Sequence, residues 1–235
     1  MNNYFLNIKK FFPTNKFIDI DIKSKYFNNI ASEISYKIYQ DNPSIHILIN
    51  NLLIDKEISY PLTKLDAHNS YTFIHSLDTA IISAMLCKSL GFNEYETYII
   101  LKGAILHDIG KIYIPNSILN KKESLDFKEY EIVKYHPALG SKMLHRLNID
   151  TSVIQDIVLY HHESLDGTGY PLGKLSDSLS SHVKIVTISD VFSAMTSNRS
   201  YRNKLSLVKA LDYLSQNSDI KFDSLMVRTL IKILS

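Results

Sequence analysis

Apolar residues return every three or four positions from residue 70 onward. In the segment from Ser70 to Gly91 they fall at Ile74, Leu77 and Ile81. This spacing places apolar side chains on one face of an α-helix. Ser70 offers an N-cap hydroxyl and Gly91 a typical helix end, so we predict a helix between them.

Two further helices are predicted from their first residues. Asn93 with Glu96, and Asp126 with Glu129, each place a side-chain acceptor three residues before a glutamate, as in a capping box. The first of these helices should run through Leu106. The second should continue toward residue 136.

Other helices are predicted over residues 151–160, 205–214 and 224–234, the first with Asp150 or Thr151 as its N-cap. Pro137 has no backbone N–H, so it should either kink the helix that begins near residue 126 or begin a new one.

Residues 181–197 fit two structures. β-Branched residues such as Val183 favour a strand, whereas the four-residue spacing of Val186, Asp190 and Ala194 suits a helix. Local rules leave the choice open.

The first 62 residues carry a weaker pattern. Apolar and charged residues alternate over residues 17–22, as in a short strand, and two amphipathic helices follow. Residues 61–69 are polar and are the predicted boundary. We therefore divide the chain into an N-terminal segment of unknown role, residues 1–62, and a main domain, residues 63–235.

Charge and composition narrow the classes of partner. A formal net charge of +2 gives no broad attraction to nucleic acid polymers or to anionic membranes. No apolar run approaches the roughly 20 residues of a membrane span, and no signal peptide is evident, so a cytoplasmic protein is expected. The single cysteine, Cys87, excludes a disulfide within the chain and is expected to be a reduced core thiol.

Histidines and aspartates gather at predicted helix ends. His107 and Asp108 follow one helix, and the adjacent His161 and His162 follow another. Imidazole and carboxylate form a mixed ligand set, and one carboxylate can bridge two cations. Lys111 lies one turn beyond Asp108, where its ammonium can meet a phosphate oxygen. The candidate metal ligands are His75, His107, Asp108, His136, His161, His162 and Asp190.

Several polar residues also have ordinary structural interpretations. Two adjacent histidines at a helix end are often exposed side chains, and only the other candidate ligands favour a metal site here. Asp78 is expected to be solvated, and Tyr71 to be a packing aromatic. Glu163 is either a partner of a ligand or a surface charge, and His145 and His182 belong to no motif.

Four segments carry a resemblance to a known family. They are residues 107–111 (His-Asp-Ile-Gly-Lys), 136–140 (His-Pro-Ala-Leu-Gly), 161–171 (His-His-Glu-Ser-Leu-Asp-Gly-Thr-Gly-Tyr-Pro) and 190–202, which begins Asp-Val-Phe. Over roughly residues 65 to 232 the chain resembles the HD-GYP subgroup of the HD-domain metal-dependent phosphohydrolases. His75 stands at the position of the family's first ligand.

The resemblance implies an all-α fold, an HD-domain helical bundle with an HD-GYP extension, and a helix over residues 181–197. It implies hydrolysis of cyclic di-GMP to pGpG, with GMP as a further product, by a hydroxide that bridges two iron or manganese ions. Asp108 would bridge the metals, and Lys111 would contact the scissile phosphate. The implied substrate-binding residues are Lys111, Asp166, Gly167, Gly169, Tyr170, Pro171, Arg199 and Arg202.

The chain departs from the family pattern at a few positions. Tyr71 stands where members with three metals carry a glutamate, so two metals are favoured. Asp78 stands where arginine is common, Ser193 where aspartate is common and Ser200 where proline is common. No candidate ligand is lost, but these changes affect the expected substrate contacts.

Two other functions remain open: an HD phosphohydrolase for another nucleotide or cyclic dinucleotide, and a non-catalytic module that binds cyclic di-GMP. The Gly-Tyr-Pro loop is also a candidate contact for a diguanylate cyclase, and a homodimer is left open.

Overall fold

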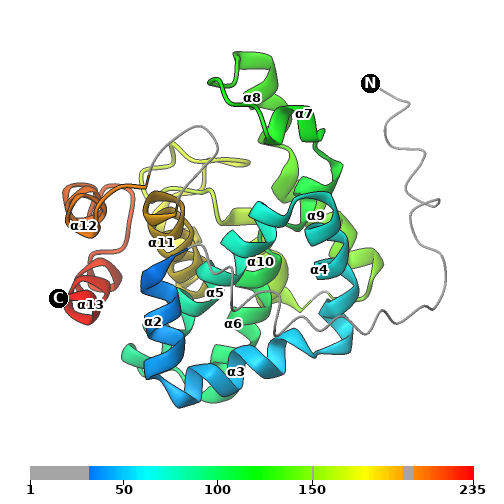
Figure 1. Cartoon of the computed structure of the whole chain (residues 1–235). Coiled ribbons are helices and arrows are strands. Elements are labelled where there is room, and N and C mark those ends of the chain that lie inside the picture. The colour runs from blue at the N-terminus through cyan, green and yellow to red at the C-terminus, as the bar shows by residue number, and fades with distance from the viewer. Residues whose placement is uncertain (1–31, 150, 198–203) are drawn as a thin grey trace.

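The structure, a computed structural model, describes residues 32–149, 151–197 and 204–235, and within them it contains helices and isolated bridges but no strand (Figure 1). The predicted all-α fold is confirmed. The helices are α2 (Glu33–Asp41), α3 (Pro43–Leu53), α4 (Lys56–His68), α5 (Ser70–Ser89), α6 (Glu94–Leu106), α7 (Asn116–Leu119), α8 (Phe127–Val133), α9 (His136–Arg146), α10 (Ser152–Tyr160), α11 (Ser181–Thr196), α12 (Leu207–Gln216) and α13 (Ser224–Leu234), with short 3-10 helices η2 (Ile109–Tyr113) and η3 (Ser176–Ser178).

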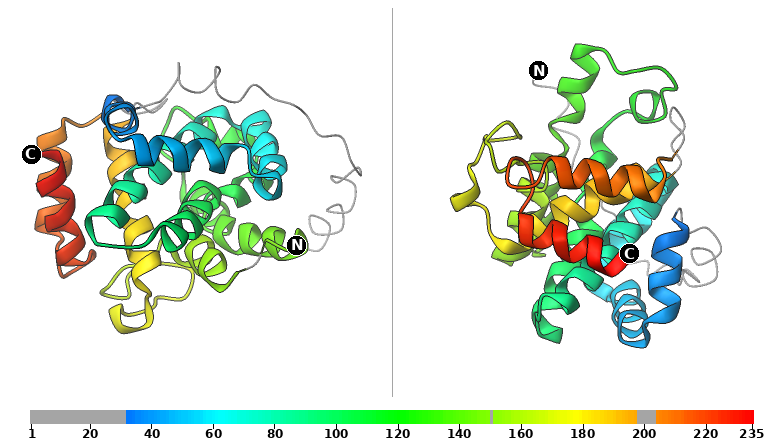
Figure 2. Two further views of the ribbon diagram at one scale, coloured as in Figure 1. Left: turned by 90° about the horizontal axis from the view of Figure 1, so that it is seen from below. Right: turned by 90° about the vertical axis from the view of Figure 1, so that its left-hand side faces the viewer.

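Helix α5 lies at the centre of the bundle. It packs along α6 on one side and α11 on another, and α10 packs against α6 and α9. Helices α12 and α13 lie beside α11 at the edge of the molecule (Figure 2). Because several faces of α5 are covered, it buries polar as well as apolar residues, and Phe73, Leu77 and Ile81 contribute to the core.

The predicted helix starts are mostly correct. Capping boxes open α6 and α8, and Thr151 caps α10 by accepting from the backbone N–H of Ile154. The prediction for α5 is wrong by one residue, because Asn69 and not Ser70 caps this helix. The Asn69 carboxamide accepts from the N–H of Thr72 at 2.9 Å.

The polar stretch at residues 61–69 is not a linker. Most of it is part of α4, and Pro61 lies buried inside this helix. The hydrophobic positions Leu62 and Leu65 pack into the core on the same face. The predicted division at residue 62 therefore falls within a helix, and a separate role for residues 1–62 stays a prediction. The predicted strand at residues 17–22 lies outside the described residues.

The structure settles both choices that the sequence leaves open. Residues 181–196 form α11, whose β-branched side chains, including Val183 and Val186, are buried against the rest of the bundle. Tertiary packing thus outweighs strand propensity here. Pro137 begins a new helix, α9, as its second residue.

The structure also describes the surroundings of Cys87 and the length and hydropathy of each helix. Cys87 is a buried free thiol, and burial raises its pKa to about 12. Among the described residues, no helix is both long and apolar enough to cross a membrane.

Candidate metal centre

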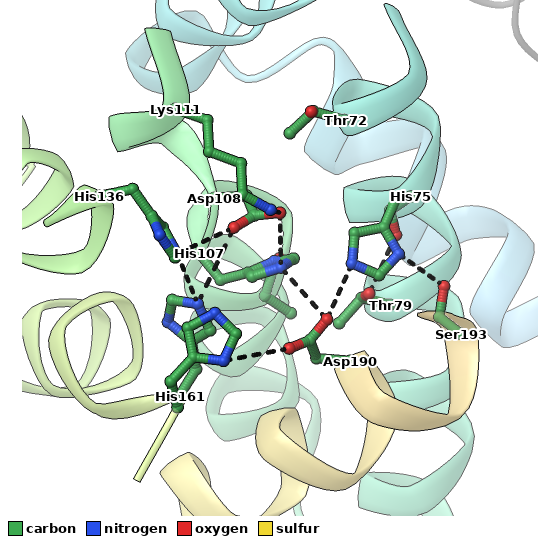
Figure 3. A network of polar contacts seen from close by, with 12 residues as sticks. Thr72, His75, Thr79, His107, Asp108, Lys111, His136, His161, Asp190 and Ser193 are labelled. Carbon is green, nitrogen blue, oxygen red and sulfur yellow. Dashed lines mark hydrogen bonds and ion pairs between the residues drawn. The ribbon is translucent and has the colours of Figure 1, made fainter. Parts of the chain in front are cut away.

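All seven candidate ligands meet in one cluster, in which six are buried and His162 is partly exposed. Figure 3 labels the six buried ones. They form three overlapping groups, and the ligand atoms of each group lie within 4.8 Å of one another. Asp108 belongs to two of the groups. The groups are Asp108 with His136, His161 and His162; His75 with His107 and Asp108; and His107 with His161 and Asp190.

Helix ends supply most of these side chains. His107 is the C-cap of α6, His161 is the C-cap of α10, and His136 is the first residue of α9. The C-terminal ends of α6 and α10 carry partial negative charge, which favours a cation nearby. His75 and Asp190 come instead from the middle of α5 and α11 and face each other across the contact between these helices.

Backbone carbonyls fix the orientation of three imidazoles. His107, His136 and His161 each donate Nδ1–H to the carbonyl oxygen of the residue three positions earlier, at 2.7, 2.7 and 3.1 Å. A neutral imidazole with its proton on Nδ1 presents a lone pair at Nε2. In the neutral form, all three Nε2 atoms therefore point lone pairs toward the cluster.

These lone pairs oppose one another. The Nε2 atoms of His136 and His161 are 3.2 Å apart, and His136 Nε2 is 3.1 Å from Asp108 Oδ1. The buried Nε2 of His107 has no hydrogen-bond partner among the described residues. Adjacent acceptors without a donor are unfavourable in a buried site. A cation between them removes this repulsion, so the donor set fits metal ions.

Burial and nearby charges favour the metal-binding forms of Asp108, His161 and His162, whereas the carboxylates of Asp108 and Asp190 raise the pKa of His107 against the effect of burial. Burial opposes ionisation of Asp108, but the ammonium of Lys111, 2.6 Å away, and the neighbouring His107 hold its pKa well below the usual range. Burial lowers the pKa of His162 to about 3, and burial also lowers that of His161. Ionised carboxylates and neutral imidazoles are the states that coordinate cations.

His75 is held by a side chain and not by the backbone. Its Nε2 lies 2.8 Å from Asp190 Oδ1, and its Nδ1 lies 2.9 Å from the hydroxyl oxygen of Ser193. Ser193 comes one turn after Asp190, so both face α5. In the sequence, Ser193 stands out only as a departure from the family pattern, and its contact with His75 was not predicted.

Close packing explains a glycine of the 107–111 motif. A Cβ atom on Gly110 would overlap the carbonyl oxygen of His136 and would come within 2.6 Å of the backbone nitrogen of Gly140. The absence of a side chain lets η2 touch the first turn of α9. This contact holds Asp108 beside His136.

A family model for the HD domain matches residues 52–226. The chain belongs to the HD domain family. Two curated relatives are cyclic dinucleotide phosphodiesterases by name. Cyclic di-GMP phosphodiesterase PdeB of Borreliella burgdorferi is 34% identical over 176 residues, which cover 75% of this chain and 46% of PdeB. The 3'3'-cGAMP-specific phosphodiesterase 3 of Vibrio cholerae is 30% identical over 194 residues, covering 82% of this chain and 42% of that protein.

The chain thus spans less than half the length of these relatives. A solved structure, the HD-GYP-type protein Bd1817 from Bdellovibrio bacteriovorus, aligns with a TM-score of 0.61 at 18% identity. The alignment covers 92% of this chain and 74% of Bd1817. This likeness supports the fold. The family model and the named cyclic dinucleotide phosphodiesterases agree with the resemblance to the HD-GYP subgroup that the sequence motifs carry.

The Gly-Tyr-Pro loop of this HD domain is tied to the histidine pair. The carboxylate of Glu163 accepts from the backbone N–H groups of Leu172 and Lys174 at 2.7 and 2.9 Å. Gly169 lies so close that a Cβ atom there would come within 2.5 Å of Glu163 Cα. Glu163 is buried, so the surface-charge interpretation is wrong.

Tyr170 in this loop contacts the cluster. Its ring stacks on that of His162, with centroids 4.7 Å apart and planes inclined by 28°. Burial raises the pKa of Tyr170, and the charges of Asp108 and Asp190 raise it further, so the phenol is neutral. The loop thereby places an aromatic wall beside the candidate ligands.

The other predicted substrate residues lie farther from the cluster or outside the described residues. Asp166 is exposed, and its carboxylate accepts from the N–H and hydroxyl of Thr168 at 3.0 and 2.7 Å, which forms a local turn. Gly167 has a φ of 76° in this turn, and Pro171 is exposed. Arg199 and Arg202 fall within residues 198–203, which the structure does not describe.

Asp78 is not solvated as expected. It lies on α5 one turn beyond His75 and is fully buried. The hydroxyl of Ser197 donates to its Oδ2 at 3.3 Å. Burial raises the pKa of Asp78 to about 8, so this carboxyl is mostly protonated at neutral pH.

Proposed function

We propose that this HD domain is a metal-dependent phosphodiesterase that hydrolyses cyclic di-GMP to pGpG, with GMP as a further product. The observation that carries the proposal is the set of opposed, proton-free imidazole and carboxylate acceptors around Asp108. The relatives' names supply the substrate class.

Two divalent metal ions, of iron or manganese type, fit this ligand set. Asp108, His107 and His161 each belong to two of the ligand groups, but only a carboxylate has two oxygens that can bind two cations, so Asp108 would be the bridging ligand. Tyr71 lies beside His75 with its ring stacked at 6.4 Å, where a third cation would need a carboxylate. The proposed ligands are His75, His107, Asp108, His136, His161, His162 and Asp190.

Bound divalent cations lower the pKa of water and polarise phosphoryl oxygens, which supplies a nucleophile and an electrophile for hydrolysis. Lys111 is the proposed catalytic cation of the chain itself. Its ammonium lies 2.6 Å from Asp108 Oδ2 and its side chain is 20% exposed, so it can turn toward a phosphate oxygen. There it stabilises the negative charge that grows as the 3′-oxygen leaves.

Other cyclic dinucleotides form the second candidate substrate class. The relative from Vibrio cholerae is named for 3'3'-cGAMP, and the two substrates differ in one base. Arg199 and Arg202, which carry the expectation of base or phosphate contacts, lie outside the described residues. Discrimination between the bases is therefore a question for the substrate assay.

The proposed partners follow from the exposed part of the Gly-Tyr-Pro loop. Leu172 and Leu175 are 65% and 62% exposed and offer an apolar contact on the loop. A diguanylate cyclase is the proposed partner class, and a homodimer is the alternative use of this surface.

The proposal is tested on protein purified without oxygen. Iron and manganese are measured on the same sample that is assayed with cyclic di-GMP, 3'3'-cGAMP and cyclic di-AMP, with pGpG as the expected product of the first. Asp108→Ala should lose metal and turnover together, whereas Lys111→Ala should retain metal and lose roughly a hundredfold or more in kcat. Turnover by metal-free Asp108→Ala would overturn the mechanism.

A further inference from the structure

Lys134 lies between two tyrosine rings, one of which, Tyr170, stacks on the candidate ligand His162. Its Nζ is 5.5 Å from the centroid of Tyr130 and 5.8 Å from that of Tyr170. Glu131 accepts from the same ammonium at 2.6 Å. Lys134 caps the C-terminal end of α8 and comes two residues before His136.

Tyr170 connects this lysine to the metal centre. One of its neighbours is Lys134, and another is the stacked ring of His162. His162 shares a ligand group with Asp108. A ligand held at the metal centre would therefore lie next to Tyr170, and its far end could reach the ammonium of Lys134.

The ammonium of Lys134 is held in place and still has hydrogen-bond donors available for a ligand. It has three N–H donors, and Glu131 takes one of them in the part of the chain that the structure describes. Its side chain is 30% exposed, so the remaining donors face solvent or a ligand. The two aromatic rings and the carboxylate restrict where the ammonium can go, which reduces the entropy lost on binding an anion.

Resting on the proposed function, we infer that Lys134 binds the second phosphodiester of the cyclic dinucleotide, the one not held at Asp108 and Lys111. A cyclic dinucleotide has two such anions, and a compact ammonium suits a phosphate oxygen better than a planar base edge. The lysine belongs to none of the family motifs in the sequence, so its contact with Tyr170 is what reveals it.

The test compares Lys134→Ala with Lys128→Ala, a matched change at an exposed lysine of the same helix α8. Three substrates are used: cyclic di-GMP, bis(p-nitrophenyl) phosphate, and thymidine 5′-p-nitrophenyl phosphate. The second has one phosphodiester and no base, and the third has one phosphodiester and a base. Calorimetric binding of a phosphorothioate analogue of cyclic di-GMP provides a readout other than turnover.

Lys134→Ala should raise KM for cyclic di-GMP, and Kd for its analogue, by about tenfold or more, as expected for a lost charge-assisted hydrogen bond. Rates on both single-phosphodiester substrates should stay unchanged, which also shows that the variant folds and holds its metals. Lys134→Arg should restore most of the affinity, and Lys128→Ala should behave like the natural protein.

Three results would overturn the assignment. They are an unchanged KM for cyclic di-GMP, an equal loss on all three substrates, and a loss that extends to the thymidine compound but not to bis(p-nitrophenyl) phosphate, which would indicate a base contact. A natural protein that cleaves bis(p-nitrophenyl) phosphate but neither binds nor cleaves cyclic dinucleotides would instead refute the proposed function, and the assignment of Lys134 with it.

Discussion

Four histidines of the cluster are oriented by the group that contacts their Nδ1 atom. Backbone carbonyls hold His107, His136 and His161, and side-chain mutation cannot remove these acceptors. His75 depends on the Ser193 hydroxyl. A partner on the far nitrogen orients a ligand imidazole and raises its basicity, so Ser193 is the adjustable member of this group.

Ser193→Ala should therefore weaken metal binding at the His75 and Asp190 side by roughly 10- to 100-fold. Ser193→Asp should bind metal at least as tightly as the natural protein, because a carboxylate is the stronger acceptor for an imidazole N–H. Titration of the metal-free protein with Mn²⁺, followed by calorimetry, measures both. Equal affinities for the natural protein and the alanine variant would contradict this role.

A second residue-scale prediction concerns Asp78. Its pKa is raised by burial from the ordinary value of 3.8 to about 8 in the folded protein, so the native state binds a proton that the unfolded chain releases. The free energy of unfolding should consequently fall as the pH rises from about 4 through about 8, and this contribution should level off above about pH 9. Between about pH 7 and about pH 9 this single group should remove roughly 1.4 kcal/mol.

Asp78→Asn keeps the shape of the side chain and removes the titration. Denaturant unfolding of both proteins at several pH values measures the difference, and the stability of the variant relative to the natural protein should rise with pH over that interval. A constant difference would show that Asp78 does not carry a raised pKa.

At the scale of elements, the Gly-Tyr-Pro loop is a preformed part of the site. Glu163 binds two backbone N–H groups across the loop, and Tyr170 rests on His162. Glu163→Ala removes two charge-assisted hydrogen bonds, each worth about 1.5–3 kcal/mol. Hydrogen exchange at the amides of Leu172 and Lys174 should accelerate at least tenfold, with metal content unchanged.

Asp177→Ala provides the control for that experiment, because this carboxylate follows in the same connection but is exposed. In Asp177→Ala, hydrogen exchange at the amides of Leu172 and Lys174 should match that of the natural protein. Unchanged exchange at residues 172 and 174 in Glu163→Ala would show that packing of Tyr170 alone orders the loop.

Local signals explain which elements could be predicted. The capping boxes of α6 and α8 and the Thr151 cap depend on contacts within four residues, and the sequence displays them directly. α11 could not be decided locally, since burial against distant helices overrides its strand propensity. The same limit applies to the burial of Asp78 and to the contact of Ser193, whose partners lie more than a hundred residues away.

At the scale of the whole molecule, the bundle gathers side chains from α5 to α11 into one site. The seven candidate ligands were predicted as a set because each stands in a recognisable motif. Lys134 and the anchoring role of Glu163 were not, because these contacts become visible only when the loop folds over the helix ends. Residue identity thus predicted the chemistry, and the fold supplied the geometry.

Metal removal should lower the stability of the whole folded domain. The opposed acceptors at the centre repel one another without a cation, and ligand binding to the folded state stabilises it by mass action, by about 2.7 kcal/mol at a hundredfold excess over Kd. Chelation should lower Tm, and Mn²⁺ should restore it, as measured by calorimetry. Identical melting curves with and without chelator would indicate that the cluster holds no cation.

The packing of Gly110 against α9 has an evolutionary consequence. Since any side chain at this position would push on the carbonyl of His136, a mutation in one motif acts directly on the other. The two segments therefore cannot change independently, and a substitution of Gly110 is expected to require a compensating change in the first turn of α9.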